Sequence, residues 1–580
     1  MAMNKEIGYA LEYHEATKHS EASLITSRHY LDFDNKPIPF KIYLKLPSVD
    51  LPTNFPTPEA NALSCITAVI RQTPPDYTKQ LTAKLSKNTV TSTSKVDMGN
   101  LAEILFFSAG ITREMKYPYG NYYMRAASAT GALYPIELYV VCDDVSPNLV
   151  AGVYHFSPAD FSLRQIRKGG YKRYLADTAN NQDIARAPFT IIFTSFAWRN
   201  AWKYQARSYR HWFWDSGVIA ANLLATTGAM GLPARIIMGF LDDNVSQLLC
   251  LEDQKEAAIA MATIGAGLSN GTITQSQKQE QMDEVLQVSV PKVRPLSKRG
   301  EIKYPEIWQL NHASKLASKQ EIEEWISNAH SLHQQSSSKT SSYSQEEGSD
   351  NENIFITLNE LEKSITNSLT LRETILRRGS SRRFARTNIS LSTLKTILYT
   401  SARAVPIDIF ENENSLIDIY FMANGVDDLA PGGYFYNQDA SAAGAPDTFL
   451  EKIRGSASSR NISGYLCLGQ SLFSDASVVF FLMTDLQSVL RSLGNRGYRA
   501  SQFEAGVIAG RIYLTAYALR IGASGSTFFD DAVTEFFSPH AGNKSTMIAI
   551  GVGVPAYKAS PGRILSPRLS KEQLLTQDFT

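Results

Sequence analysis

The stretch SYRHWFWDSGVIAANLLATTGAMGL, residues 208–232, has a second version in GYRASQFEAGVIAGRIYLTAYALRI, residues 497–521. Both versions carry Tyr-Arg, then an acidic residue two positions before a glycine, then Val-Ile-Ala. Both continue as long apolar runs rich in Ala and Gly, with the spacing of a buried helix. A repeat of this length predicts that the chain contains two copies of one structural unit.

The segments around this repeat are also duplicated, in the same order. Residues 136–156 and 417–436 each predict two strands joined by a turn-rich connection. Buried strands are predicted by apolar runs before and after each long helix, at 187–196, 258–267, 476–485 and 547–555. Gly506 and Gly510 would let the backbone of another helix approach closely. The sequence therefore predicts a tandem duplicated α+β fold whose central helices pack together as an internal pseudo-dimer.

Length and composition indicate several domains and exclude some classes of partner. A chain of 580 residues is too long for a single hydrophobic core. Its 57 basic and 56 acidic residues give a net charge of +1, which leaves no electrostatic footprint for nucleic acid. A Ser-rich polar stretch marks the boundary between the copies. We expect an N-terminal extension at 1–95, domain 1 at 96–310, a flexible linker at 328–353 and domain 2 at 354–580.

The apolar runs and the cysteines predict a protein of the cytoplasm. The apolar run 477–483 is far shorter than a membrane helix, and the N-terminus lacks a signal-peptide core, so no membrane contact is expected. The four cysteines lie far apart in sequence, which favours reduced and mostly buried thiols. His14 and His19 are five residues apart, a poor spacing for one helix face, so no metal site is predicted.

Four further stretches carry motifs in the order of a known family: YHEATKH at 13–19, LAEILFFSAGITR at 101–113, RAASATGALYPIELYV at 125–140 and WKYQARSYR at 202–210. With the repeat, they make the chain resemble the nitroreductase superfamily of FMN enzymes, whose active sites form between two subunits. Within it, the chain resembles the SagB/ThcOx-type dehydrogenases, here with two tandem nitroreductase-like domains. Members of this branch oxidise azoline rings in modified peptides to azoles and pass a hydride to FMN, so the resemblance implies this chemistry.

The resemblance places the phosphate of FMN at LRRGSSRRF, residues 376–384, where Arg378, Ser380 and Arg382 match the superfamily pattern. Guanidinium groups pair with phosphate oxygens through two parallel hydrogen bonds, and a hydroxyl adds a donor. The alternative is a solvated basic start to a surface element. The first copy has RQTPPDYTKQL at 71–81 instead, where Arg125 could compensate. We therefore expect one FMN per chain, anchored by domain 2.

The resemblance also places a backbone donor near the flavin N5 at an acid-x-Gly turn that starts each central helix. These turns would be Glu504 to Gly506 in domain 2 and Asp215 to Gly217 in domain 1. Glycine allows the main chain to approach the flavin ring. The acid is equally explained as an ordinary residue of the first helical turn, where it favours the helix dipole.

The two copies differ at Lys203 and Tyr204, which align with Ser492 and Leu493 in the second copy. In the azoline-oxidising branch a Lys-Tyr pair at this motif serves catalysis. A lysine whose pKa is lowered by desolvation among Trp198, Trp202, Trp212 and Trp214 would be the base, with the tyrosine relaying the proton. The alternative is a solvated lysine beside a core tyrosine.

These expectations lead to an FMN-dependent oxidoreductase that acts on a modified peptide or a related small molecule, with a cyclodehydratase as a potential partner. Domain 2 would hold FMN, and domain 1 would supply the catalytic pair across the interface. Two alternatives remain open. One is an NAD(P)H-dependent nitro or quinone reductase, and the other is a non-catalytic scaffold that binds a peptide.

Overall fold

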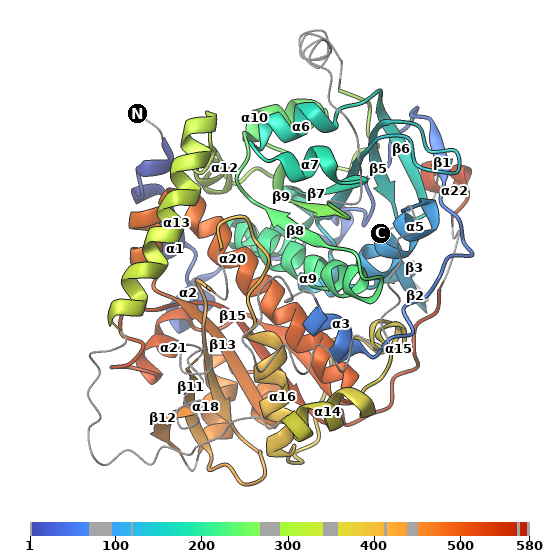
Figure 1. Cartoon of the computed structure of the whole chain (residues 1–580). Coiled ribbons are helices and arrows are strands. Elements are labelled where there is room, and N and C mark those ends of the chain that lie inside the picture. Colours follow the sequence, from blue (N-terminus) through green and yellow to red (C-terminus); the bar gives the residue numbers. More distant parts are fainter. Residues whose placement is uncertain are drawn as a thin grey trace.

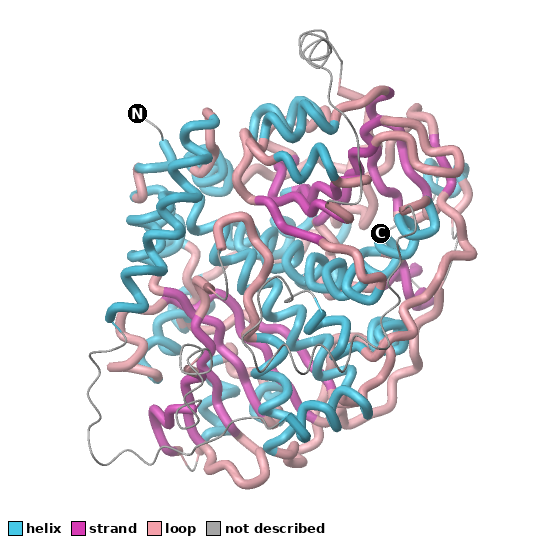
Figure 2. The backbone as a smooth tube through the Cα atoms, in the orientation of Figure 1, coloured by secondary structure: helices cyan, strands magenta, loops and turns pink. Residues whose placement is uncertain are grey.

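The computed structural model describes residues 3–68, 96–117, 120–266, 290–339, 358–410, 414–437, 450–456, 458–564 and 569–576. Two mainly β halves flank a central layer of helices (Figures 1 and 2). The sheet of domain 1 has the order β1-β6-β5-β4-β7-β9-β8, and the sheet of domain 2 has the order β12-β11-β10-β13-β15-β14. A separate hairpin pairs β2 with β3.

The strands of domain 1 are β1 (Ser48–Asp50), β2 (Ile111–Tyr117), β3 (Gly120–Arg125), β4 (Ile136–Cys142), β5 (Gly152–Ser157), β6 (Ser162–Lys168), β7 (Phe189–Phe196), β8 (Ala234–Ile237) and β9 (Glu256–Ile264). Those of domain 2 are β10 (Asp418–Ala423), β11 (Gly432–Tyr436), β12 (Leu450–Gly455), β13 (Val478–Thr484), β14 (Gly522–Ser526) and β15 (Ser545–Gly553). From β6 to β8 and from β12 to β14, the two sheets have the same strand order, and neighbouring strands run antiparallel. The predicted tandem α+β duplication is confirmed.

The helices of the first half are α1 (Gly8–Ala16), α2 (Glu21–Thr26), α3 (Ala62–Ala68), α5 (Met98–Ala109), α6 (Lys172–Thr178), α7 (Gln182–Arg186), α8 (Ala197–Tyr204), α9 (Ser208–Ala229) and α10 (Asp242–Leu248). The later helices are α12 (Pro305–Ala313), α13 (Lys319–Lys339), α14 (Leu358–Asn367), α15 (Leu371–Arg377), α16 (Leu391–Ser401), α18 (Ser459–Leu466), α19 (Ser471–Asp475), α20 (Leu486–Ala518), α21 (Asp530–Phe536) and α22 (Lys571–Thr576). The two long repeats form α9 and α20, which cross at the centre of the molecule (Figure 1).

Glycines bring α9 and α20 into backbone contact. A Cβ atom added at Gly217 would lie 2.5 Å from the carbonyl oxygen of Phe503, and one added at Gly506 would lie 2.8 Å from that of Phe213. Gly510 packs in the same way against Ala221. These distances are shorter than any real carbon contact, so only glycine permits this approach. The pseudo-dimer predicted from the small residues is confirmed, and its interface is continuous with the main hydrophobic core.

Gly506→Ala should therefore destabilise the protein by about 1–3 kcal/mol, because the added methyl group forces the two helices apart. The melting temperature measured by calorimetry checks this. Gly170→Ala is the control, since a Cβ atom there would meet nothing within 4 Å. Equal melting temperatures for the two variants would contradict the close helix contact.

Each end of the chain packs against the half that lies further away in sequence. The side-chain amide of Asn495 donates to the carbonyl oxygens of Met3 and Glu6, at the N-terminal end. At the other end, Arg563 donates its backbone N–H to Thr112 in domain 1. These exchanged arms tie the two domains together outside the helix contact.

The predicted linker is partly wrong. Helix α13 runs to Lys339, so residues 328–339 continue a helix instead of forming a flexible segment. The rest of the predicted linker, 340–353, lies outside the described residues, as does the segment 71–81. Helix α13 forms because its apolar residues Ile322, Trp325 and Ala329 recur on one face, which is buried.

Candidate active site

Two buried ion-pair clusters lie between the domains, and they are reciprocal. In one cluster, Arg207 and Arg210 of domain 1 pair with Asp530 of domain 2 at 3.0 and 2.7 Å. In the other, Arg496 and Arg499 of domain 2 pair with Asp242 of domain 1 at 2.6 and 2.7 Å. The repeated Arg-x-Tyr-Arg motif therefore serves the interface in both copies.

The stretch YHEATKH has a structural counterpart in α12 and the residues that follow it. Arg210 donates to the backbone carbonyl of His14 and to the hydroxyl of Thr17. Arg499 makes the same bonds to Asn311 and Ser314. The repeat therefore includes a helix ahead of each domain, and the second copy begins before the predicted linker. Burial, followed by the charge of Arg210, lowers the pKa of His14 well below its usual range.

The segment predicted to bind phosphate lies against domain 1. The guanidinium of Arg378 donates to the carbonyl oxygens of Arg125 and Ala126 at 2.8 and 2.7 Å. From the other side, Arg113 donates to the carbonyl oxygens of Leu376 and Arg377, both at 3.1 Å. Arg378 is buried, and two of its three guanidinium nitrogens donate to domain 1. These hydrogen bonds join the two domains.

Arg382 and Ser380 are the more accessible members of the predicted phosphate set. Arg382 is exposed, and its backbone N–H donates to the hydroxyl of Tyr557. The hydroxyl of Ser380 lies 3.4 Å from that of Tyr513, which accepts the backbone N–H of Gly525. This arrangement places the start of domain 2 beside the strand β14.

The positive charge of this region fits a phosphate group. Burial lowers the pKa of Arg113, and the charge of Arg378 lowers it further. Among the described residues, the Nε atom of Arg113 is buried and has no hydrogen-bond partner. A Cβ atom added at Gly379 would lie 3.7 Å from Arg113. An anion bound near Gly379 would accept the unpaired Nε–H of Arg113 and would offset the repulsion between Arg113 and Arg378.

Lys203 and Tyr204 end α8 and lie near Arg382. Lys203 is exposed, and its ammonium nitrogen is 5.3 Å from the centroid of the Tyr204 ring. Its pKa is lowered, first by burial of its stem and then by the charge of Arg382. The half-buried Tyr204 has a raised pKa, because of burial and the charge of Asp215. The structure thus brings together the Lys-Tyr pair of domain 1 and an arginine of domain 2.

The expected tryptophan wall around Lys203 is wrong in its placement. All four side chains are buried, and three of their indole N–H groups bond elsewhere: Trp198 to Ser297, Trp202 to the Asp32 carbonyl and Trp214 to Gln502. Trp212 packs on Tyr209 and Trp308 in the core. The apolar character of these rings places them in the core, and Tyr204 is the aromatic ring that contacts the lysine.

The two acid-x-Gly sites are not turns at helix starts. Glu504 and Gly506 lie within α20, and Asp215 and Gly217 lie within α9, where the glycines form the helix contact. The acids have equivalent roles as acceptors. Asp215 accepts the backbone N–H and hydroxyl of Thr130, and Glu504 accepts the hydroxyl of Ser415 and the backbone N–H of Leu416. Burial raises the pKa of each acid to about 7.

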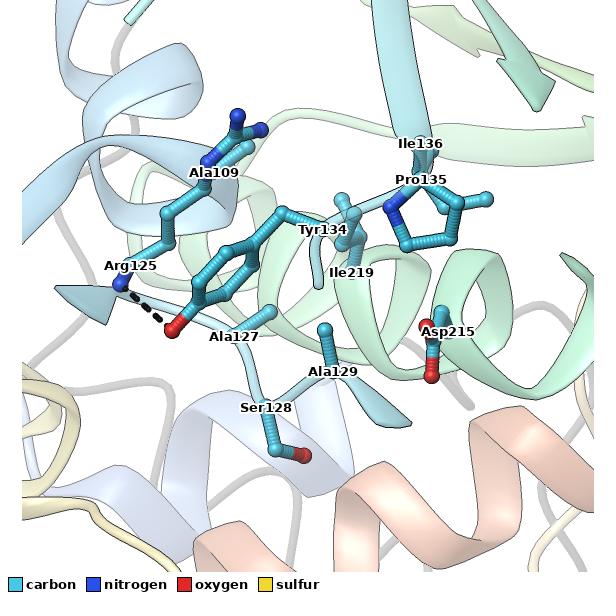
Figure 3. A pocket seen from close by; sticks show the side chains of 10 residues that line it. All are labelled: Ala109, Arg125, Ala127, Ser128, Ala129, Tyr134, Pro135, Ile136, Asp215 and Ile219. Atoms are coloured by element: carbon cyan, nitrogen blue, oxygen red, sulfur yellow. Dashed lines mark hydrogen bonds between the residues drawn. The ribbon is translucent and has the colours of Figure 1, made fainter. Parts of the chain in front are cut away.

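Arg125 contributes to the region through its backbone. Its carbonyl accepts Arg378, while its guanidinium is buried, donates to the carbonyl of Pro39 and lies over the ring of Tyr134. Figure 3 shows the hydroxyl of Tyr134 turned toward the backbone nitrogen of Arg125. The cavity that these residues line with Asp215 holds about 10 Å³, room for about one water.

The aligned pair in domain 2 lies beside α13. Leu493 is buried, and its carbonyl accepts the indole N–H of Trp325 from α13. Trp325, Ser492 and Leu493 also line a cavity of about 280 Å³. Gln205 and Gly494, the residues after each pair, share an unusual backbone conformation with φ of 49° and 65°, so the backbone is equivalent in the two copies.

Arg113, Tyr513 and Tyr557 were not predicted from the sequence. Arg113 ends the family-like stretch 101–113, so its place in that motif was the available signal. The tyrosines lie within apolar or irregular sequence and carry no such signal. The predicted buried thiols are confirmed, because all four cysteines are buried and free. The described residues contain no group of His, Cys, Asp and Glu that could hold a metal.

Comparisons with known proteins confirm the family resemblance. Residues 90–266 match the model of the nitroreductase family. The chain is 27% identical over 161 residues to a candidate nitroreductase of Methanocaldococcus jannaschii, a match that covers 28% of this chain and 77% of that protein. It is 23% identical over 140 residues to the microcin B17-processing protein McbC of Escherichia coli, covering 23% of this chain and 52% of that protein.

A solved structure matches nearly the whole chain. A candidate nitroreductase from Anabaena variabilis superposes with a TM-score of 0.64 at 24% identity, covering 94% of this chain and 99% of the other. Residues 90–266 thus form a nitroreductase family domain, and the chain has the fold of that solved structure. Within the described part of the chain, no helix is long and apolar enough to span a membrane.

Proposed function

We propose that this protein is an FMN-dependent dehydrogenase that oxidises an azoline-type ring in a modified peptide or related metabolite. The observation that carries the proposal is the electrostatic influence of Arg382 from domain 2 on Lys203 from domain 1, which are close enough for one charge to lower the pKa of the other. A cationic segment suited to a phosphate and a Lys-Tyr pair suited to proton transfer therefore face one region. The aligned positions of the other copy are Ser492 and Leu493, which offer no comparable pair for proton transfer.

Arg382, Ser380 and Arg113 would hold the phosphate of FMN, and the strand β14 would lie along the ring system. When bound, FMN supplies the acceptor for a hydride. Arg113 and Arg382 would orient the phosphate by charge-assisted hydrogen bonds, which are stronger than hydrogen bonds between neutral groups. Arg378 holds the segment against domain 1 through its hydrogen bonds to the carbonyl oxygens of Arg125 and Ala126.

Lys203 and Tyr204 suit different parts of a proton transfer. A lowered pKa gives Lys203 a larger neutral fraction near pH 7, so its amine can accept a proton from a ring carbon. A raised pKa keeps the Tyr204 hydroxyl protonated, so it suits hydrogen bonding to the substrate or proton relay. Gly131 lets the backbone approach that hydroxyl, since an added Cβ atom would lie 2.7 Å from it.

The similarity to McbC, which is named a microcin B17-processing protein, supports a substrate of this class. A cyclodehydratase would be the partner that forms the ring from a precursor peptide before this protein oxidises it. Other relatives are named as nitroreductases, which supports the reductase alternative. The experiment below distinguishes the two functions.

The purified protein should be yellow and hold about one FMN per chain. Arg382→Gln should weaken FMN binding about 10–100-fold, because a charge-assisted hydrogen bond contributes about 1.5–3 kcal/mol. Its affinity for riboflavin, which lacks the phosphate, should stay unchanged. Isothermal titration of flavin-depleted protein measures both affinities.

Arg386→Gln is the matched control, since that exposed arginine pairs with Asp475 at the surface. A colourless wild type that also fails to bind added FMN would sink the proposal and favour the scaffold. Flavin that NADPH reduces rapidly, in a protein that leaves azoline peptides unchanged, would favour the reductase.

A further inference from the structure

Arg207 and Arg496 occupy equivalent positions in the two copies, yet their guanidinium groups differ in hydrogen bonding. Arg496 donates from Nε to the carbonyl of Met238, from Nη1 to Asp242, and from Nη2 to the carbonyl of Phe240. Arg207 donates from Nη1 to Asp530 and to the carbonyl of Thr17. Its Nε and Nη2 atoms are buried and have no hydrogen-bond partner among the described residues. Leaving buried charged donors unpaired is costly, so they indicate a missing acceptor.

The two clusters also differ in charge. Arg207 and Arg210 share the single carboxylate of Asp530. Arg496 and Arg499 share Asp242, and the carboxylate of Asp408 also attracts Arg496. The cluster at Asp242 is thus balanced by a second acid of the chain, whereas the two cations at Asp530 face one carboxylate. Buried charge of one sign favours a ligand of the other.

Asp408 occupies a defined place beside β8. Its carboxylate accepts the backbone N–H of Met238 at 3.0 Å and that of Gly239 at 2.8 Å. Two backbone hydrogen bonds fix it there. The N–H of Ile236 donates to the carbonyl oxygen of Pro406 at 2.7 Å, and the N–H of Asp408 donates to the carbonyl oxygen of Ile236 at 2.9 Å. The chain therefore places a carboxylate of its own beside β8.

In the described part of the chain, Asp530 is the one carboxylate that forms an ion pair with Arg207. Met238 and Gly239 stand at the same distance before Asp242 as Ser526 and Thr527 stand before Asp530. In the described part of the structure, the Thr527 hydroxyl is buried without a partner. Arg207 lies close by, with its guanidinium carbon 5.4 Å from the centroid of the Phe528 ring.

His211 adds a second unpartnered group on the α9 side. It is 1% exposed, and both of its ring nitrogens lack hydrogen-bond partners within the described ranges. Its ring lies between those of Tyr204 and Trp214, with centroid distances of 4.5 and 4.7 Å. The aligned residue in domain 2 is Ala500, so domain 2 has no such group at this position.

We propose that Arg207 and His211 form a subsite for an anionic oxygen of the bound ligand, because both present buried and unpartnered nitrogen atoms. The inference rests on the proposed function, because the oxygen belongs either to the reduced flavin or to a carboxylate of the substrate.

Two measurements on Arg207→Lys, which keeps the charge but loses the Nε and Nη2 donors, separate the two sources. If the oxygen belongs to the reduced flavin, the ratio of the affinities for reduced and oxidised flavin should be about tenfold lower in the variant. The midpoint potential of the bound flavin then falls by about 30 mV. If the oxygen belongs to the substrate, the potential stays and the dissociation constant for benzoate, a carboxylate probe, rises about tenfold. Benzamide, the neutral analogue, should be unaffected.

Arg496→Lys is the matched control and should change neither quantity, because Asp408 faces that arginine. His211→Phe is the second variant, since it keeps a buried ring and does not touch Asp530. If both variants fold and neither changes the potential or the benzoate affinity, the subsite does not exist. A wild type without flavin would refute the proposed function, yet a benzoate affinity tenfold above that for benzamide would still support the subsite.

Discussion

Lys203→Met should lower the turnover of an azoline peptide by about 10²–10⁴-fold while the protein keeps its FMN and its melting temperature. The side chain is exposed, so its loss removes little packing. Partial burial and the charge of Arg382 lower the pKa of Lys203, which is the direction that favours a base. Turnover in the wild type should rise with pH until Lys203 is deprotonated, and the variant should lose that dependence. Single-turnover flavin reduction by the peptide measures the step directly.

Tyr204→Phe should have a smaller but parallel effect, because the ring contacts with His211 remain and only the hydroxyl is lost. Ser492→Ala, at the aligned position of domain 2, should be nearly silent. An equal loss in Ser492→Ala would indicate two active clefts. A Lys203→Met protein that sheds its flavin or melts early would show that the lysine is structural.

Asp530→Asn should give the largest loss of stability, about 3–5 kcal/mol, because it leaves Arg207 and Arg210 buried without a counter-charge. For a domain of this size, that corresponds to a fall in melting temperature of roughly 10 °C. Asp242→Asn should cost less, since Asp408 remains near Arg496. Scanning calorimetry of the three proteins gives the order directly.

Asp531→Asn is the control for this comparison. It removes the next carboxylate along the chain, which is largely exposed and pairs with Lys18 at the surface, so its effect should stay within about 0.5 kcal/mol. Equal effects of Asp530→Asn and Asp531→Asn would contradict the view that the reciprocal clusters hold the domains together.

The repeat itself was readable from the sequence because it rests on local periodicity. The alternating strands, the long helical stretches and the small residues at Gly506 and Gly510 predict the same elements wherever they occur. The contact between α9 and α20 follows from them, since only glycine lets two helix backbones meet. The linker prediction was wrong at 328–339, where the backbone continues the helix α13, whose residues Ile322, Trp325 and Ala329 are buried.

The candidate site was only partly readable. The sequence places Lys203, Ser380 and Arg382 in family-like motifs, but it does not show that Lys203 and Arg382 meet. It also does not show that Arg378 is engaged by carbonyl oxygens of domain 1. Both facts depend on side chains of different copies. These side chains lie far apart in the sequence, so no local sequence pattern predicts that they come together.

The sequence by itself determined the two copies, their order of elements and the types of residue available for chemistry. The tertiary structure decided which groups surround the equivalent positions of each copy. Helix α13 lies against Leu493, and Asp408 lies against β8, whereas two donors of Arg207 stay unpaired among the described residues. The reason is physical: the repeated pattern builds equivalent elements, but the segments from elsewhere in the chain that pack against them differ.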